Sequence, residues 1–146
     1  MMRVTFHDQQ RGLAWWLAHT EPLSDQMPPG AQAATVLDES DNIVAVILYA
    51  PIGSIWEMHF TSDGTKRWAT RATLREIFDY AFNFLGLARV SGFIASGNAA
   101  ALKAALDIGF VVEGEIREAA PGDDALVMIG MLRRECRWIR QGTGHG

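Results

Sequence analysis

The alternation of apolar and polar positions along the chain predicts a domain in which strands and helices are unevenly mixed. Apolar stretches of strand length lie at 2–7, 33–38, 43–50, 54–61, 88–95, 110–117 and 125–132. Apolar positions recur at helical spacing in 9–19, 74–85 and 99–108. Because three of the strands follow one another without a helix between them, the sheet must be mixed and cannot be a repetitive doubly wound parallel sheet. The predicted fold class is therefore α/β (α+β), with a mixed and mostly antiparallel sheet.

Turn and cap residues support these boundaries. The sequence ESDN at 39–42 has the composition of a hairpin turn. Asn98 is a good N-cap for the helix that follows it, and Gly86 and Gly109 are good helix stops. The stretch 21–30 holds three prolines and a glycine, so it predicts a loop with room for a short helical turn.

Length and composition indicate one domain over residues 1–146, with about 141–146 as a flexible tail. The longest apolar run, 43–52, is far shorter than the roughly 18–20 residues that span a bilayer, and the N-terminus turns polar too early for a secretory signal. Cys136 is the single cysteine, which fits a reducing compartment, so we expect a cytoplasmic protein without a membrane partner.

The charge of the chain narrows its partners. With 13 basic and 17 acidic side chains the formal net charge is −4, which disfavours non-specific nucleic-acid binding. Two local basic clusters remain: Lys66, Arg67, Arg71 and Arg75, and then Arg133, Arg134, Arg137 and Arg140. The four histidines show no metal-ligand spacing, and Cys136 has no histidine partner at a motif spacing, so we predict neither a metal site nor a cysteine nucleophile.

The first cluster lies in a strand–loop–helix segment, 54–78, where a phosphate site is conceivable. The N-terminus of a helix carries unpaired N–H groups and a partial positive charge, both of which favour a phosphate. Lys66, Arg67 and Arg71 add positive charge beside it. Taken alone, the segment also fits an ordinary turn with a solvated basic face.

A second segment, 89–118, carries a more specific pattern. It combines a strand, a helix that opens at Asn98 and closes at Gly109-Phe110, and then Glu113-Gly114 and Arg117. With the preceding YAFNFLGLARVSGFI, this resembles the C-terminal half of the GCN5-related N-acetyltransferase (GNAT) superfamily. The resemblance spans roughly 43–138 and is closest to the branch that acetylates ribosomal-protein N-termini and related small amines.

The resemblance implies more about the fold and the cofactor. Two central parallel strands, here 54–61 and 88–95, are expected to splay apart at a bulge in the first one, with helices on both faces of the sheet. The cofactor, acetyl-CoA or another acyl-CoA, would lay its pantetheine arm in the gap and its pyrophosphate on the start of the next helix. The residues implied in cofactor binding are Phe60, Thr61, Arg67, Trp68, Ala69, Thr70, Arg71, Ala72 and Asn98.

Two departures from the family pattern stand out. In the phosphate loop, which aligns as 67–72, Thr70 replaces the middle glycine that allows close backbone approach, and Trp68 is unusually bulky. Ala105 stands where many members carry a tyrosine that protonates the leaving thiolate, so water would have to supply that proton.

The candidate catalytic residues are Glu57 and His59, which share one face of the strand 54–61. An amine must lose a proton as it attacks a thioester, and a carboxylate or an imidazole can accept it. The alternatives are a surface glutamate and a partly buried, hydrogen-bonded histidine. The resemblance implies that the region of Trp15, Trp16 and the stretch 21–30 determines which acceptor binds.

The predicted function is transfer of an acetyl group to a primary amine by direct attack. The acceptor stays open among a protein N-terminus, a lysine, a small polyamine-like metabolite and a nucleobase amine, and a homodimer also stays open. The alternative is a catalytically degenerate protein that keeps the GNAT fold as a structural or interaction module.

Overall fold

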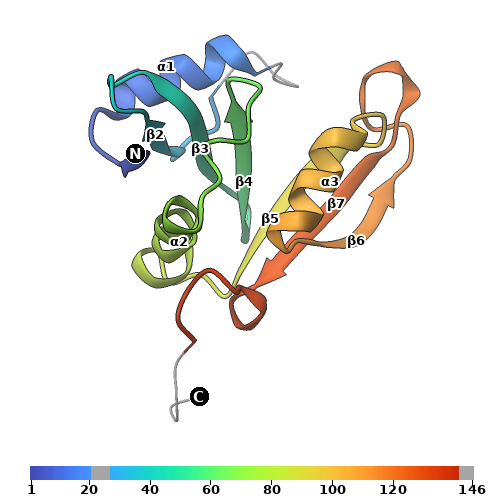
Figure 1. Ribbon diagram of the computed structural model, residues 1–146. Coiled ribbons are helices and arrows are strands. Elements are labelled where there is room, and N and C mark those ends of the chain that lie inside the picture. Colours follow the sequence, from blue (N-terminus) through green and yellow to red (C-terminus); the bar gives the residue numbers. More distant parts are fainter. Residues whose placement is uncertain (21–26, 142–146) are drawn as a thin grey trace.

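A computed structural model describes residues 1–20 and 27–141, so most of the predicted loop at 21–30 and the predicted flexible tail lie outside the described residues. One seven-stranded sheet runs in the order β1-β2-β3-β4-β5-β7-β6 (Figure 1). The strands are β1 (Arg3–Thr5), β2 (Gln32–Leu37), β3 (Ile43–Ile52), β4 (Ile55–Ser62), β5 (Arg89–Ala95), β6 (Val111–Ile116) and β7 (Leu126–Leu132). Only β4 and β5 pair in parallel, which confirms the mixed, mostly antiparallel sheet.

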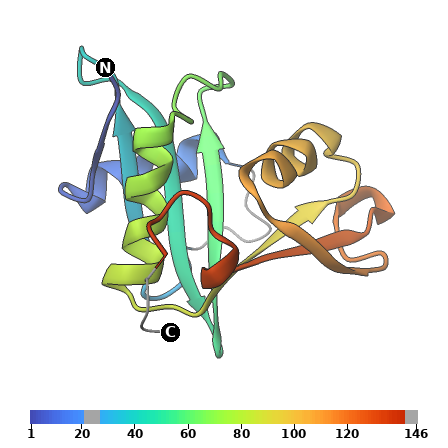
Figure 2. The same cartoon turned by 60° about the horizontal axis from the view of Figure 1, so that its bottom comes forward.

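Helices cover both faces of the sheet, as the resemblance implied (Figure 2). The helices are α1 (Gln9–His19), α2 (Arg71–Asp79) and α3 (Ala99–Ile108), with short 3₁₀ turns at Pro121–Asp123 and Arg133–Glu135. On one face, Trp16 of α1 packs with Ala33, Val46 and Leu48. The larger core lies on the opposite face, where α2, α3 and the chain after β7 pack together. In the described residues, no helix has the length and apolarity to cross a membrane.

The apolar spacing predicted a regular helix that continues from α2 to Leu85, but the structure shows an interruption. A π-helical turn, Tyr80–Phe84, follows α2, and the N–H of Leu85 donates to the carbonyl of Tyr80 at 2.8 Å. This wider turn keeps Ala81 and Phe82 buried in the core. Gly86 then ends the helical segment with a φ of 70°, which a residue with a side chain adopts at a cost.

The sheet splits between β4 and β5. These strands are eight and seven residues long, yet a single pair, Glu57 with Ser91, joins them. The expected bulge in β4 is wrong, because β4 stays in unbroken register with β3 along its whole length. Register shifts occur instead at Val36/Leu37 and Val112/Gly114. The strands therefore part without any irregularity in β4.

Aromatic packing joins the two halves of the sheet where ladder hydrogen bonds do not. The ring of Phe60, on β4, lies 6.1 Å from that of Phe110, which follows α3, and 6.3 Å from that of Phe78 on α2. Phe78 and Phe110 are themselves 6.1 Å apart. Three mutually packed rings thus connect the N-terminal and C-terminal halves across the split.

The cap of α3 provides a test of this fold. The side-chain oxygen of Asn98 accepts a hydrogen bond of 3.1 Å from the N–H of Ala101. We expect Asn98→Ala to lower the free energy of unfolding by about 1 kcal/mol, because it leaves that N–H without its partner. Asn98→Ser, which can still cap, should stay within a few tenths of a kcal/mol of the parent. Urea unfolding measures both, and equal stability of all three proteins would contradict the assignment.

Candidate active site at the split

Glu57 and His59 form a hydrogen-bonded pair beside the split. Glu57 is only 5% exposed and sits at the single junction between β4 and β5. Its Oε1 lies 2.7 Å from Nε2 of His59, whose side chain is about one-third exposed. The ring of Trp16 meets the imidazole edge-on at 5.7 Å between centroids. The two predicted catalytic residues are therefore together, on the face of the sheet that carries α1.

Polar groups continue across the junction on the same face. Ser91 is buried opposite Glu57, and Nε of Arg89 donates to its Oγ at 3.2 Å. Arg89 also forms an ion pair with Glu113 on β6. Among the described residues, Trp16 Nε1 is a buried donor that has no hydrogen-bond partner. Sequence reasoning did not single out Ser91, since only the pairing register places it beside Glu57.

Beyond the junction, the main chain of β4 pairs on one side only. Phe60 and Thr61 lie opposite Ile47 and Val46 of β3, and within the described chain no ladder pair joins them to β5. The side chain of Phe60 belongs to the core, so only its main chain faces the gap. Unpaired strand groups of this kind can accept an extended ligand as an added strand.

The loop between β4 and α2 places its bulky residue in the core. Trp68 is buried and packs on Phe60 with 5.8 Å between ring centroids, so its side chain does not face a ligand. The N–H of Ala69 is engaged by the carbonyl of Lys66 at 3.0 Å. Trp68 could therefore contact the cofactor only through its main chain, and its place among the cofactor-binding residues stays a prediction.

Thr70 caps α2, and its backbone conformation does not require a glycine. Its hydroxyl accepts from the N–H of Thr73 at 3.1 Å, and its own N–H donates to the Thr73 hydroxyl at 3.0 Å. This reciprocal arrangement is a capping box, and Thr70 has an ordinary extended conformation with a φ of −86°. In the first turn of α2, the N–H groups of Arg71 and Ala72 have no hydrogen-bond partner among the described residues.

An arginine-lined groove of about 710 Å³ opens beside these two N–H groups. Its lining comes from the first turns of α2 and from the chain after β7: Arg71, Ala72, Arg75, Glu76, Arg137, Trp138, Ile139 and Arg140. None of its four arginines takes part in an ion pair within the described residues. Two members of each basic cluster seen in the sequence thus meet in space, which their separation along the chain did not reveal. We call this feature the arginine groove.

The chain after β7 is fixed against the end of α3. The indole N–H of Trp138 donates to the carbonyl of Ile108 at 2.8 Å, and the guanidinium of Arg137 donates to the carbonyl of Asp107. Arg137 also lies over the Trp138 ring, 4.5 Å from its centre. Burial raises the pKa of the Cys136 thiol, which makes a thiolate at this position less accessible.

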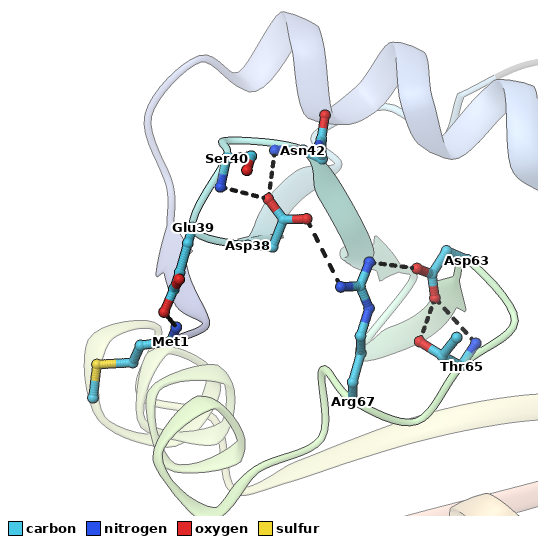
Figure 3. Close-up of polar contacts among 8 residues, drawn as sticks. All are labelled: Met1, Asp38, Glu39, Ser40, Asn42, Asp63, Thr65 and Arg67. Atoms are coloured by element: carbon cyan, nitrogen blue, oxygen red, sulfur yellow. Dashed lines mark hydrogen bonds and ion pairs between the residues drawn. The ribbon is translucent and has the colours of Figure 1, made fainter.

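Arg67 does not line the arginine groove. Figure 3 shows its guanidinium between the carboxylates of Asp63 and Asp38. The nitrogen–oxygen distances are 3.0 Å to Asp63 and 3.8 Å to Asp38. Its side chain is thus engaged by two aspartates, and its place among the cofactor-binding residues stays a prediction. Asn98 caps α3 through its side-chain oxygen, and Ala105 is buried, so the place of the family's tyrosine carries no proton donor.

Comparison with solved structures identifies the fold. A chimera of the spermidine N-acetyltransferase SpeG from Vibrio cholerae with hSSAT superposes with a TM-score of 0.71 at 17% identity, covering 91% of this chain and 96% of that one. Glutamate-to-glutamine mutant forms of the spermidine/spermine N-acetyltransferase SpeG from Vibrio cholerae give 0.72 at 16% identity, covering 92% and 96%. SpeG in complex with manganese ions gives 0.66 at 15% identity, covering 90% and 91%.

The sequence itself matches no family model and no curated protein. These three structures are of spermidine acetyltransferases, so they do not support the closer resemblance to the ribosomal-protein branch. At this level of identity the likeness concerns the backbone arrangement alone. This chain has the GNAT fold.

Proposed function

We propose that the protein transfers an acyl group, acetyl in the simplest case, from an acyl-CoA to a primary amine by direct attack. The observation that carries the proposal is the parting of β4 and β5 beyond the pair of Glu57 and Ser91. The arginine groove lies on the side of the sheet that carries α2, and the Glu57–His59 pair lies on the side that carries α1. Donor and acceptor would thus meet from opposite faces of the sheet.

The arginine groove fits the phosphate end of an acyl-CoA. Four guanidinium groups and the two N–H groups that open α2 offer charge-assisted hydrogen bonds to phosphate oxygens. The volume of about 710 Å³ lies in the range of ordinary ligand sites. When bound, the cofactor supplies the thioester that holds the acyl group. The main chain of Phe60 and Thr61 is the part of β4 that would pair with its extended arm.

The Glu57–His59 pair is suited to accept the proton of the amine. Because Nε2 of His59 donates to Glu57, Nδ1 is the ring nitrogen that remains able to take up a proton. The buried carboxylate orients the imidazole. Ala105 offers no proton donor, so water would have to supply the proton for the thiolate of the cofactor.

For the acceptor, we propose only its chemical class, a primary amine. The similar structures act on spermidine according to their names, which favours a small amine among the acceptors considered. The alternative function is a non-catalytic GNAT-fold module. Thr70 in place of glycine and Ala105 in place of tyrosine favour it, because both remove features that members of the superfamily use.

Binding of the cofactor separates the two functions. Acetyl-CoA at millimolar concentration should raise the melting temperature, because a ligand of the folded state stabilises it by mass action. The double variant Arg75→Gln/Arg140→Gln should weaken the calorimetric affinity by about tenfold or more, since it removes two charged donors from the groove.

Arg134→Gln is the matched control for that experiment. Arg134 belongs to the same part of the chain but does not line the groove, so its affinity should equal that of the parent. Absence of any binding by the parent protein would leave the non-catalytic module as the function. Equal weakening in the control would show that overall charge, and not the groove, governs the affinity.

The catalytic pair is tested by kinetics. Glu57→Gln keeps the hydrogen bond to His59 and removes the negative charge, so we expect the turnover number to fall by about tenfold or more with little change in cofactor affinity. Part of the loss should return as the pH rises, because amines with a pKa near 10 then arrive neutral more often. Glu115→Gln, on the exposed strand β6, is the control.

His59→Gln divides the roles within the pair. A loss as large as that of Glu57→Gln indicates that the imidazole carries the proton, and a small loss indicates that the carboxylate accepts it directly. If neither change affects turnover in a parent enzyme that is active, the site on β4 is wrongly assigned.

A further inference from the structure

A single guanidinium fastens the loop that leads into α2 to the turn between β2 and β3 (Figure 3). Arg67, from the loop, donates to Asp63 Oδ2 at 3.0 Å and lies 3.8 Å from Asp38 Oδ2 in the turn. The side chains of Asp38 and Asp63 are only 17% and 26% exposed, which limits competition from water. We call these three residues the Arg67 clamp.

Each carboxylate of the clamp uses its two oxygens differently. Oδ1 of Asp38 accepts two main-chain N–H groups of its own turn, at 2.9 and 3.0 Å. Oδ1 of Asp63 accepts the N–H and the hydroxyl of Thr65, at 3.0 and 2.6 Å. The Oδ2 atoms are the ones that face Arg67. Each aspartate therefore fixes its own segment, and Arg67 joins the two segments.

Both carboxylates are held in the charged form. The main-chain hydrogen bond from Asn42 is the largest cause that lowers the pKa of Asp38, and the positive charge of Arg67 lowers it further. For Asp63, the hydrogen bond from the Thr65 hydroxyl is the largest cause of its lowered pKa, again with Arg67 contributing. One cation thus faces two anions, and the clamp as a whole carries negative charge, which repels a phosphate.

The clamp instead controls where α2 begins. Directly after Arg67, the ring of Trp68 is buried against Phe60, and Thr70 caps the helix two residues later. A segment fixed at Arg67 and again at Trp68 has little freedom to move the first N–H groups of α2. Those N–H groups, of Arg71 and Ala72, are the ones that open beside the arginine groove.

We propose that Arg67 is a positioning residue, which holds the start of α2 ready for a phosphate without contacting it. The proposal rests on the proposed function, because it concerns the same cofactor site. A positioning role and a ligand role for Arg67 predict opposite effects on anion binding when an aspartate of the clamp loses its charge. Removing the charge of Asp63 should strengthen the binding of an anion by Coulomb's law alone, whereas loss of a positioning contact should weaken it.

The decisive experiment compares the calorimetric affinity for acetyl-CoA of Arg67→Gln, Asp63→Asn and the double variant. We expect each single change to weaken binding by about two- to fivefold, the range that partly exposed ion pairs give. The double variant should be no weaker than Arg67→Gln alone, because both changes break the same contact. Asp41→Asn is the control, since Asp41 lies in the same turn but pairs with Arg3.

If Asp63→Asn binds as tightly as the parent or more tightly while Arg67→Gln binds more weakly, Arg67 is a phosphate ligand and the proposal is wrong. Hydrogen exchange of the ligand-free protein tests the clamp without any cofactor. Amides in 63–73 should exchange faster in Arg67→Gln and Asp63→Asn, and at the parental rate in Asp41→Asn. Unchanged exchange in all three would overturn the clamp, whereas a parent protein that fails to bind acetyl-CoA would overturn only the proposed function.

Discussion

The junction between β4 and β5 is the constraint on which the rest of the structure depends. One parallel pair, Glu57 with Ser91, is the only ladder contact between two long strands in the described chain. Parallel pairing is slightly weaker than antiparallel pairing, and here it stops after one step. The aromatic contacts of Phe110 with Phe60 and Phe78 bridge the two halves where ladder pairs are absent. The sheet can therefore open without the two halves separating.

This division also sorts the chemistry by face. Apolar side chains and the arginine groove lie toward α2 and α3, where the unpaired N–H groups of α2 favour an anion. The buried carboxylate of Glu57 and the imidazole of His59 lie toward α1, where they can exchange a proton. The face with the arginine groove suits a polyanionic donor, and the face with the Glu57–His59 pair suits an amine acceptor. In the proposed function, their separation by one layer of sheet keeps the guanidinium groups of the arginine groove away from the Glu57–His59 pair that would accept the proton.

The sequence predicted the fold well because its signals are local. Apolar periodicity and the cap and stop residues Asn98 and Gly109 place α3 correctly, and three successive strands predict the antiparallel half of the sheet. The bulge in β4 was wrong, since it came from the resemblance and not from the residues of this chain. Composition around 67–72 indicated a phosphate site but could not show that Trp68 turns into the core.

Long-range contacts account for what sequence reasoning missed at the site. The arginine groove needs residues from 71–75 and 137–140 side by side, and the Arg67 clamp needs Asp38 from another turn. The spacing of residues along the sequence indicates neither the arginine groove nor the Arg67 clamp.

The account depends most on the claim that β4 beyond Glu57 is the docking edge for the acyl donor, and hydrogen exchange with and without acetyl-CoA measures this directly. We expect added protection at amides of 58–62 together with the start of α2. Protection confined to other parts of the chain, or none at saturating acetyl-CoA, would contradict the account.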